Sequence, residues 1–260
     1  MSEEEIQIGT DADIERRFGG LRRLHGVHAY DRLRQARLVV VGVGGVGSWT
    51  VEALARSGVA SLTLIDLDHV AESNINRQIQ ALESTLGQAK VLALRDRIAQ
   101  IHPTCQVHTI EEFLDESNVT SLLQADAVDV VVDCCDQVKA KAALIAWAWA
   151  QGKPVISAGA AGGKFEPQRV EVADLADVTH DPLLASVRQR LRQRHAGPRK
   201  GKMKVTCVFS REAVKPPQDA CDVDASSDGS LNCHGYGSSV TVTATFGMVA
   251  AAQAMRCVIA

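Results

Sequence analysis

Missing from the 260-residue chain is any pair of cysteines in the C-x-x-C spacing that a zinc ribbon requires. An odd total of seven cysteines also argues against the fully paired disulfide framework of a small secreted domain. The acidic residues 1–8 lack the cationic and apolar regions of a signal peptide. We therefore expect no zinc, reduced thiols and a cytoplasmic protein.

Net charge and apolar runs bear on whether the protein binds nucleic acid or a membrane. A formal net charge of −3 does not by itself indicate nucleic acid or a membrane surface as a partner, and nothing predicts binding to DNA. Residues 240–260 form an apolar run that is about long enough to span a membrane and carries a single charge, Arg256. Because three threonines and Gln253 spread polar groups around it, we expect a helix in the core or at a dimer interface. Membrane association is the less favoured alternative.

Short apolar runs alternate with helical patterns along residues 37–158. The run VDVVVD at 128–133 has little polar alternation, which is typical of a parallel strand buried on both faces. This order predicts an α/β fold with a Rossmann-like, doubly wound and mostly parallel sheet. Strands are expected at 37–41, 61–66, 106–110, 128–133 and 154–158, and helices at 48–56, 90–101 and 138–151.

The chain divides into three expected regions. Residues 1–29 are expected to form an N-terminal helical arm, 30–160 a nucleotide-binding Rossmann-like domain, and 161–260 a C-terminal extension for substrate handling and dimerisation. The extension departs from regular alternation, since a strand candidate at 204–209 and a Pro-, Asp- and Ser-rich loop at 215–229 precede the terminal helix.

A glycine-rich loop follows the first expected strand and opens the first helix of the sheet. Its sequence, GVGGVG, contains Gly42, Gly44, Gly45 and Gly47. Such glycines let backbone N–H groups approach a phosphate, whose charge the helix dipole favours. Asp66 follows 24 residues after Gly42 at the end of the next strand, where a carboxylate suits ribose hydroxyls. Taken alone, the glycine loop is more typical of a dinucleotide-binding oxidoreductase, and Asp66 suits the ribose in either case.

Further polar residues after the second strand favour a triphosphate. A dinucleotide site normally needs one acidic residue here, yet Asp68 and the string SNINRQ follow. Arg77 offers a planar fork of donors for the β- and γ-phosphates. Asn74 and Asn76 can position a reacting carboxylate and the α-phosphate, and Gln78 completes the string. These residue types suit adenylyl transfer.

Lys90 and Asp136 complete the predicted site. Lys90 begins the next helix, where an ammonium can neutralise charge that develops in the transition state. Asp136 lies at the carboxyl end of the strand at 128–133, where it is placed to hold Mg2+. Asp133, inside that strand, is interpreted as structural, and packing explains Cys134 and Cys135. Together the residues predict an enzyme that uses ATP and Mg2+.

Several of these motifs resemble the ubiquitin-activating-enzyme-like superfamily, which includes adenylyltransferases of molybdopterin and thiamine synthesis. They are GVGGVGS, IDLDHV, SNINRQ, Lys90 and DCCDQ, within residues 30–160. Outside that range, RFGGLRRLHG, AGAAGGK, DPLLASVRQRL and CVFSREA resemble the tRNA threonylcarbamoyladenosine dehydratase family. This resemblance implies ATP-dependent adenylation of the carboxylate of threonylcarbamoyladenosine in tRNA, ring closure by an internal nucleophile, and a homodimer.

The chain departs from the sulfur-carrier adenylyltransferases of the superfamily at two places. Those proteins carry two C-x-x-C zinc pairs near the C-terminus, which this sequence lacks. They also carry an N-terminal arginine that reaches the ATP of the partner subunit, and ungapped matching puts Gly20 there. Arg17, Arg22 and Arg23 are the alternatives for that role.

Basic residues concentrate in one segment of the C-terminal region. Residues 188–204 contain eight Lys or Arg and no acid. Such a run is usually a solvated helix face, but it also suits tRNA phosphates, with affinity that falls steeply with salt. The candidate tRNA contacts are Arg188, Arg192, Arg199, Lys200 and Lys202.

The sequence also allows other functions. The runner-up function is an adenylyltransferase that activates the C-terminal glycine of a ubiquitin-like sulfur carrier. Two others are an NAD-dependent oxidoreductase and a non-catalytic binding module, with a cysteine desulfurase or its sulfur acceptor as an undecided partner. Cys233 lies in a glycine-rich loop beside His234. It is either a reactive thiol or a residue of a flexible loop with no chemical role, and the second interpretation is favoured.

Overall fold

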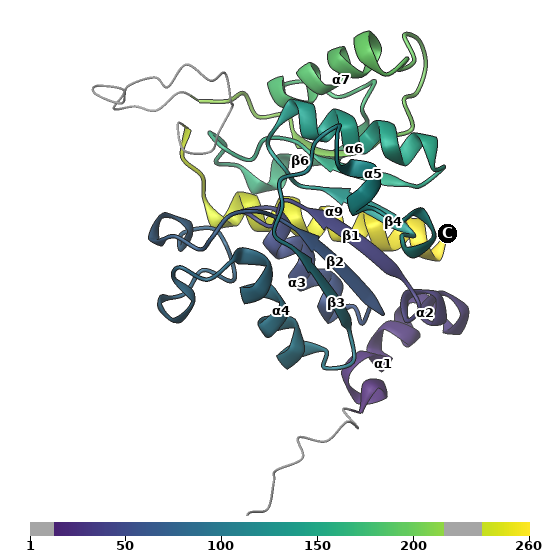
Figure 1. Ribbon diagram of the computed structural model, residues 1–260, viewed down its shortest axis with the longest axis vertical. Coiled ribbons are helices and arrows are strands. Elements are labelled where there is room, and N and C mark those ends of the chain that lie inside the picture. The colour runs from purple at the N-terminus through teal and green to yellow at the C-terminus, as the bar shows by residue number, and fades with distance from the viewer. Residues whose placement is uncertain (1–12, 216–235) are drawn as a thin grey trace, which may run out of the picture.

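The computed structural model describes residues 13–215 and 236–260. Within them, seven strands form a sheet of order β3-β2-β1-β4-β5-β7-β6 (Figure 1). Neighbouring strands are parallel except β6, which runs antiparallel to β7. The predicted α/β class and mostly parallel sheet are confirmed. The strands are β1 (Arg37–Val41), β2 (Ser61–Ile65), β3 (Gln106–Ile110), β4 (Val130–Asp133), β5 (Val155–Ala158), β6 (Val170–Asp174) and β7 (Thr206–Ser210).

Helices cover both faces of the sheet, with α3, α4 and α9 on one side and α5, α6 and α7 on the other (Figure 1). Within the expected N-terminal arm, the described residues form α1 and the start of α2. The helices are α1 (Ile14–His25), α2 (Val27–Leu33), α3 (Gly47–Arg56), α4 (Lys90–Ile101), α5 (Val119–Leu122), α6 (Val138–Ala150), α7 (Pro182–Arg194) and α9 (Val240–Ile259).

Strand β1 shows why the central strands read as continuous apolar runs. Side chains alternate across the sheet, so Leu38 and Val40 join the core under α3, α4 and α9. Val39 and Val41 join the second core, under α6 and α7. Because helices cover both faces of the sheet, the residues that point to either face are apolar, and the strand shows no alternation with polar residues. Strand β4 is likewise buried throughout but begins at Val130, two residues later than predicted, because residues 125–127 form a 3-10 turn.

The C-terminal helix α9 packs against α3, so one side of it lies in the core, which is one of the two places expected for it. A Cβ atom on Gly247 would lie 2.5 Å from the backbone oxygen of Val46, so glycine is required where the two helices cross. By length and composition α9 is the one helix among the described residues that could cross a membrane. One side of it, including Val242, Phe246 and Ala250, is nevertheless buried in the protein core.

The strand order creates a crevice at the carboxyl ends of the central strands. Chain order reverses between the adjacent strands β1 and β4, so their following segments lead to opposite faces. In open α/β sheets, ligands bind beyond the carboxyl ends of the strands at such a switch point. Strands β6 and β7, although later in the chain, extend the same sheet beside β5.

Candidate functional site

A cleft of about 250 Å³ opens at the carboxyl ends of the central strands. It collects residues from the loops after β1, β2, β3, β4 and β5, together with single residues of α7 and α9. The structure thus brings together residues that lie far apart in the sequence. The predicted site residues that line it are Gly42, Gly44, Gly45, Asp66, Asp68, Arg77, Gln78, Lys90 and Asp136.

The glycine loop packs tightly against the turn after β4. Gly42 has a positive φ of 78°, and a Cβ atom on it would lie 2.7 Å from the backbone nitrogen of Cys135. A Cβ atom on Gly47 would lie 1.8 Å from the backbone oxygen of Gly42, so only glycine lets the start of α3 pack directly against the backbone of the loop. Close backbone approach therefore requires both glycines.

Asp66 ties the glycine loop to the end of β2. Its carboxylate accepts hydrogen bonds from the backbone N–H of Val43 at 2.7 Å and of Asp68 at 2.9 Å. Burial raises the pKa of Asp66, while Lys90 and these two N–H groups oppose part of the rise. A carboxylate can accept about four hydrogen bonds, so Asp66 retains acceptor capacity for ribose hydroxyls.

Arg77 brings a largely buried positive charge to the cleft, with 9% of its surface exposed. Its Nη1 atom donates to the backbone oxygen of Ser73 at 2.5 Å and to Oδ1 of Asn76 at 2.9 Å. Both acceptors are neutral, so these contacts orient the guanidinium without neutralising it. The indole of Trp49 also donates to the backbone oxygen of Arg77, which fixes the main chain at this point.

Lys90 is a second buried cation at the cleft. Its Nζ atom lies 2.7 Å from Oδ2 of Asp68, and the Lys90 side chain is 7% exposed against 70% for Asp68. The backbone N–H of Lys90 also donates to the backbone oxygen of Asp68. An exposed carboxylate is a replaceable partner, so a phosphate can take its place beside the ammonium.

Asn74, Asn76 and Gly47 do not line the cleft as the other predicted residues do. The Oδ1 atom of Asn74 accepts from the backbone N–H of Ala71 and closes the short turn Glu72–Asn74. Asn76 orients Arg77 and donates to the backbone oxygen of Ser238. The two amides thus hold the segment that carries Arg77, and a direct role in catalysis stays a prediction.

Asp136 lies exposed on the turn after β4, beside the glycine loop. Among residues 13–215 and 236–260, no three His, Cys, Asp or Glu side chains gather to form a metal cage. One carboxylate next to a phosphate cradle instead fits Mg2+, which proteins commonly bind through one or two carboxylates together with substrate phosphates. The donor set therefore fits a cation that arrives with a nucleotide.

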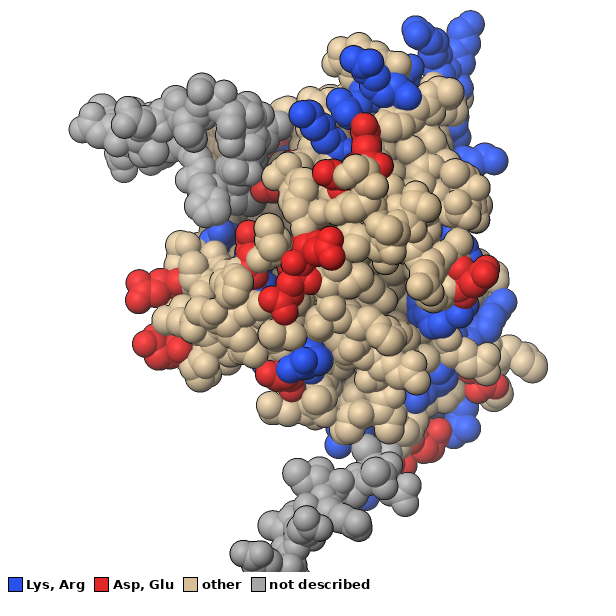
Figure 2. Space-filling model, in the orientation of Figure 1, with Lys and Arg blue, Asp and Glu red and all other residues tan. Residues whose placement is uncertain are grey.

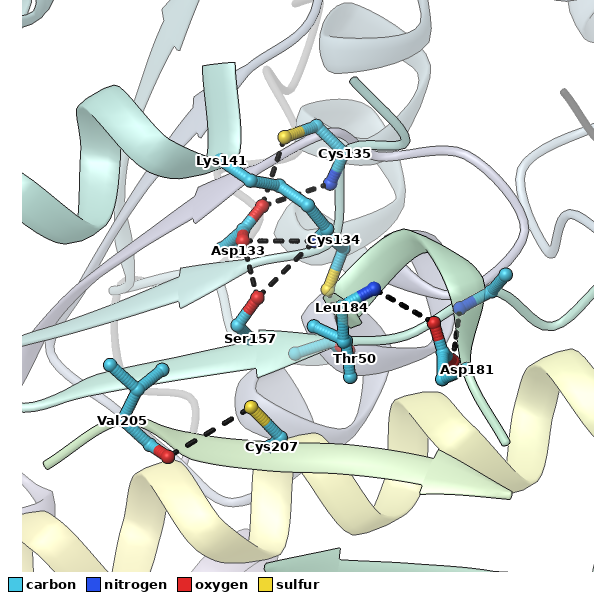
Figure 3. A network of polar contacts seen from close by, with 11 residues as sticks. Thr50, Asp133, Cys134, Cys135, Lys141, Ser157, Asp181, Leu184, Val205 and Cys207 are labelled. Atoms are coloured by element: carbon cyan, nitrogen blue, oxygen red, sulfur yellow. Dashed lines mark hydrogen bonds and ion pairs between the residues drawn. The ribbon is translucent and has the colours of Figure 1, made fainter. Parts of the chain in front are cut away.

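Beneath this turn lies a buried polar network that the sequence did not predict in full (Figure 3). Asp133, Lys141 and Ser157 are each 0% exposed. Oδ2 of Asp133 lies 2.8 Å from Nζ of Lys141 and accepts from the hydroxyl of Ser157 at 2.6 Å. Asp133 is thus structural, as interpreted from its position inside the strand. Lys141 is one of two lysines in the Ala-rich helix α6, and nothing in the sequence distinguishes it from Lys139 as the buried one.

The neighbouring thiols are unsuited to nucleophilic attack. Burial raises the pKa of Cys134 to about 12, and burial together with Asp133 raises the pKa of Cys135 well above its ordinary value. Since the thiolate is the reactive form, both cysteines stay protonated and packed. Cys233 and His234 lie outside the described residues.

The rim of the cleft includes apolar residues that the sequence analysis missed. Leu67 and Phe113 are 53% and 43% exposed, and both line the cleft at the ends of β2 and β3. Exposed apolar side chains at a cleft suit the face of a purine ring. The only sequence signal was their position directly after expected strands. Other lining residues that were not predicted include Glu112, Leu114, Gln137, Gly159, Ala160, Ala161, Leu183 and Thr243.

The basic segment lies on α7 and the loop that follows, and Figure 2 shows Lys and Arg side chains gathered over α7. Arg188 donates to the backbone oxygens of Leu175 and Val178, so it serves the fold. Arg192 donates to the backbone oxygen of Pro198, and Lys202 pairs with Asp177. Of the candidate tRNA contacts, Arg199, Lys200 and Lys202 are exposed on the loop.

The N-terminal arginines contact the chain's own fold. Arg17 donates to the backbone oxygens of Gln100 and Ile101 at the end of α4. Arg22 pairs with Glu15 on the same helix.

Comparison with known proteins gives consistent matches. The ThiF family matches residues 19–260. The tRNA threonylcarbamoyladenosine dehydratase of Escherichia coli is 42% identical over 248 residues, which covers 92% of both chains. That of Haemophilus influenzae is 41% identical over 246 residues, covering 93% of this chain and 92% of the relative. The crystal structure of the E. coli enzyme TcdA in complex with ATP superposes with a TM-score of 0.84 at 40% identity and covers 94% of each chain.

Proposed function

The chain belongs to the ThiF family, and on that premise we propose that it is an ATP-dependent tRNA threonylcarbamoyladenosine dehydratase. The proposal is supported by relatives of that name over more than nine-tenths of the chain and by a relative solved with ATP. The observation that carries it is the cleft, where a glycine loop, two buried cations and an exposed carboxylate meet.

The first step is formation of an acyl-adenylate. The carboxylate of the substrate attacks the α-phosphorus of ATP, a new C–O–P linkage forms, and the bond to pyrophosphate breaks. Arg77 and Lys90 stabilise the charge on the departing pyrophosphate, and the N–H groups of the glycine loop hold the phosphates. Asp66 and Asp68 bind the ribose. Gln78 lines the cleft beside them, and Asn74 and Asn76 hold the segment that positions Arg77.

In the second step, a nucleophile within the modified nucleoside attacks the activated carbonyl and displaces AMP. A ring forms, a proton is released, and the nucleoside has lost one water overall. Asp136 would hold Mg2+, which supplies charge neutralisation for the phosphates when bound. The reaction needs no enzyme nucleophile, in agreement with the protonated state of Cys134 and Cys135.

The partners in this proposal are tRNA and a second copy of the chain. The basic segment at 188–204 supplies the tRNA surface, and the region 161–260 handles substrate and dimerisation. On α9, Val240, Ala244 and Met248 share a helix face, and Val240 and Met248 are 39% and 42% exposed, which suits a dimer contact. Size-exclusion chromatography with light scattering tests the dimer, and a cysteine desulfurase or its sulfur acceptor can be added in the same experiment. The proposed location is the cytoplasm.

The decisive experiment incubates purified protein with ATP, Mg2+ and tRNA that carries threonylcarbamoyladenosine. Mass analysis of the released nucleosides should show the loss of one water. No change in mass, together with pyrophosphate exchange on a ubiquitin-like sulfur carrier, would favour the sulfur-carrier adenylyltransferase instead. Binding of NAD in place of ATP would favour an oxidoreductase.

Replacing Asp136 by Ala should abolish dehydration while the protein stays folded, because the side chain is exposed and lines the cleft. Circular dichroism and the midpoint of thermal unfolding report the fold, and the nucleoside assay reports activity. Asp31→Ala, which removes an exposed carboxylate from α2, is the matched control and should retain full activity. Dehydration by Asp136→Ala at the wild-type rate would remove this residue from the mechanism.

A further inference from the structure

The turn that carries Asp136 is held at both of its ends by a buried ion pair (Figure 3). Asp133 ends strand β4, and Lys141 lies in the first turns of α6. The turn 134–137 connects them, so the 2.8 Å contact between Asp133 and Lys141 closes a loop around it. Ser157 on β5 bonds to the same Asp133 oxygen and anchors the pair to the sheet.

The second oxygen of Asp133 reaches into the turn itself. Oδ1 accepts from the backbone N–H of Cys135 at 3.3 Å and from its thiol at 2.9 Å. Cys135 precedes Asp136, and its backbone nitrogen is also the atom nearest to where a Cβ on Gly42 would lie. One carboxylate therefore fixes the direction of the chain immediately before Asp136 and beneath the glycine loop.

Stability alone is a weak reason for such a pair. Removing two charges from water costs several kcal/mol each, and apolar residues of similar volume often replace buried pairs with no loss of stability. Burial acting alone would lower the pKa of Lys141, but Asp133 raises it above its ordinary value, so the ammonium remains charged. What apolar replacements cannot supply is the directed hydrogen bonding at the start of the turn.

We propose that Asp133 and Lys141 are positioning residues for Asp136, and that their ion pair sets the place of the Asp136 carboxylate relative to the glycine loop. The inference rests on the proposed function, since that function gives Asp136 its role. Both residues are fully buried and neither lines the cleft, so the pair acts only through the turn.

The test uses a variant in which both charges are removed together. Lys141→Met alone would leave Asp133 buried without a partner and endanger folding. The double variant Asp133→Asn/Lys141→Met keeps the shapes and an acceptor for Cys135 but abolishes the ion pair. Ile145→Ala, one turn further along α6 and also 0% exposed, destabilises the same helix without touching the turn and serves as the control.

Calorimetric ATP titrations, with and without Mg2+, measure the gain in affinity that the cation provides. The double variant should lose about tenfold or more of that gain, as is usual when residues behind a metal ligand are changed. ATP affinity without Mg2+ should change little. The Ile145→Ala control should keep the gain.

A double-mutant cycle with Asp136→Ala decides whether the pair acts through Asp136. If it does, adding the double variant to Asp136→Ala causes no further loss of the Mg2+-dependent gain. Independent, additive losses, or a double variant with the wild-type gain, would overturn the inference while leaving the proposed function standing. A wild-type protein whose ATP affinity is insensitive to Mg2+ would overturn the role of Asp136 and this inference together.

Discussion

At the scale of single residues, Gly42 and Gly44 differ in what an added methyl group would meet. On Gly42 it would lie 2.7 to 2.9 Å from backbone atoms of residues 134 and 135, at a positive φ. On Gly44 the nearest atom is the side-chain Nε2 of Gln78, at 3.8 Å. We predict that Gly42→Ala lowers the free energy of unfolding by about 1–3 kcal/mol, measured by urea unfolding, because the backbone conformation becomes strained.

Gly44→Ala is the matched comparison for this loop. Its added methyl group would not clash with the fold but would stand in the cleft, where a phosphate needs close approach. Stability should therefore stay near that of the wild type, while ATP affinity falls in a calorimetric titration. Equal losses of stability for the two variants would show that the packing of Gly42 against the β4 turn does not matter.

Sequence reasoning was strongest for residues that directly follow a strand. Asp66, Asp136 and the glycine loop come together because carboxyl ends of parallel strands share one edge of a sheet. The contact with Ser157 could not be predicted in the same way, because Ser157 comes beside Asp133 only when strands β4 and β5 pair. The sequence also does not show the direction of a side chain, so the bond by which Asn74 closes its own short turn could not be predicted.

At the scale of elements, helix α1 is docked on the body through a buried histidine. The ring of His102 lies 4.8 Å from that of Phe18, and its Nε2 atom lies 2.8 Å from Nη1 of Arg34. Burial, together with the charge of Arg34, lowers the pKa of His102 to about 4 from 6.5. The imidazole therefore stays neutral in the folded protein at pH values where the unfolded chain binds a proton.

The sign of the pH effect follows from that difference. The unfolded state binds more protons between pH 6.5 and about 4, so the contribution of His102 is fully present above 6.5 and is lost as the pH falls to 4. We predict a loss of up to about 3 kcal/mol from this group over that range. Urea unfolding at several pH values measures it. His102→Gln, which keeps an acceptor for Arg34 but does not titrate, should flatten the profile, and an unchanged profile would contradict the assignment.

The crossing of α9 and α3 gives a second prediction for elements. The carbonyl of Gly247 accepts a bond from the hydroxyl of Thr50 at 3.2 Å, and a Cβ atom there would lie 2.9 Å or less from three atoms of α3 and the residue before it. Gly247→Ala should lower the free energy of unfolding by about 1–3 kcal/mol through overpacking. The exposed Arg256→Ala on the same helix should stay within about 0.5 kcal/mol of the wild type, as surface changes usually do. Thermal unfolding of both variants checks the difference.

The limits of sequence reasoning at this scale lie in long-range pairing. The apolar patterns located β1 to β5 to within about two residues, because each strand is bounded by its own helix and turns. They did not place β7 beside β5 or reverse the direction of β6, since those pairings join segments that the chain brings together only in the folded sheet.

At the scale of the whole molecule, charge is segregated: the segment 188–204 is basic, whereas the chain as a whole is slightly acidic. If tRNA phosphates contact the exposed Arg199 and Lys200, their removal should weaken binding and reduce its dependence on salt. For Arg199→Ala/Lys200→Ala we predict that the slope of log affinity against log salt falls by about 1 for each phosphate that the variant no longer neutralises. Filter binding of tRNA over a series of salt concentrations measures the slope.

A matched loss of charge elsewhere separates a specific surface from general attraction. Arg16 and Arg95 are exposed on α1 and α4, away from α7, so Arg16→Ala/Arg95→Ala removes the same net charge. This control should leave the salt slope close to that of the wild type, because a contact with phosphate depends on position as well as on net charge. ATP affinity should be unchanged in both double variants, since none of the four residues lines the cleft. Equal slopes for the two double variants would mean that tRNA approaches over another face of the protein.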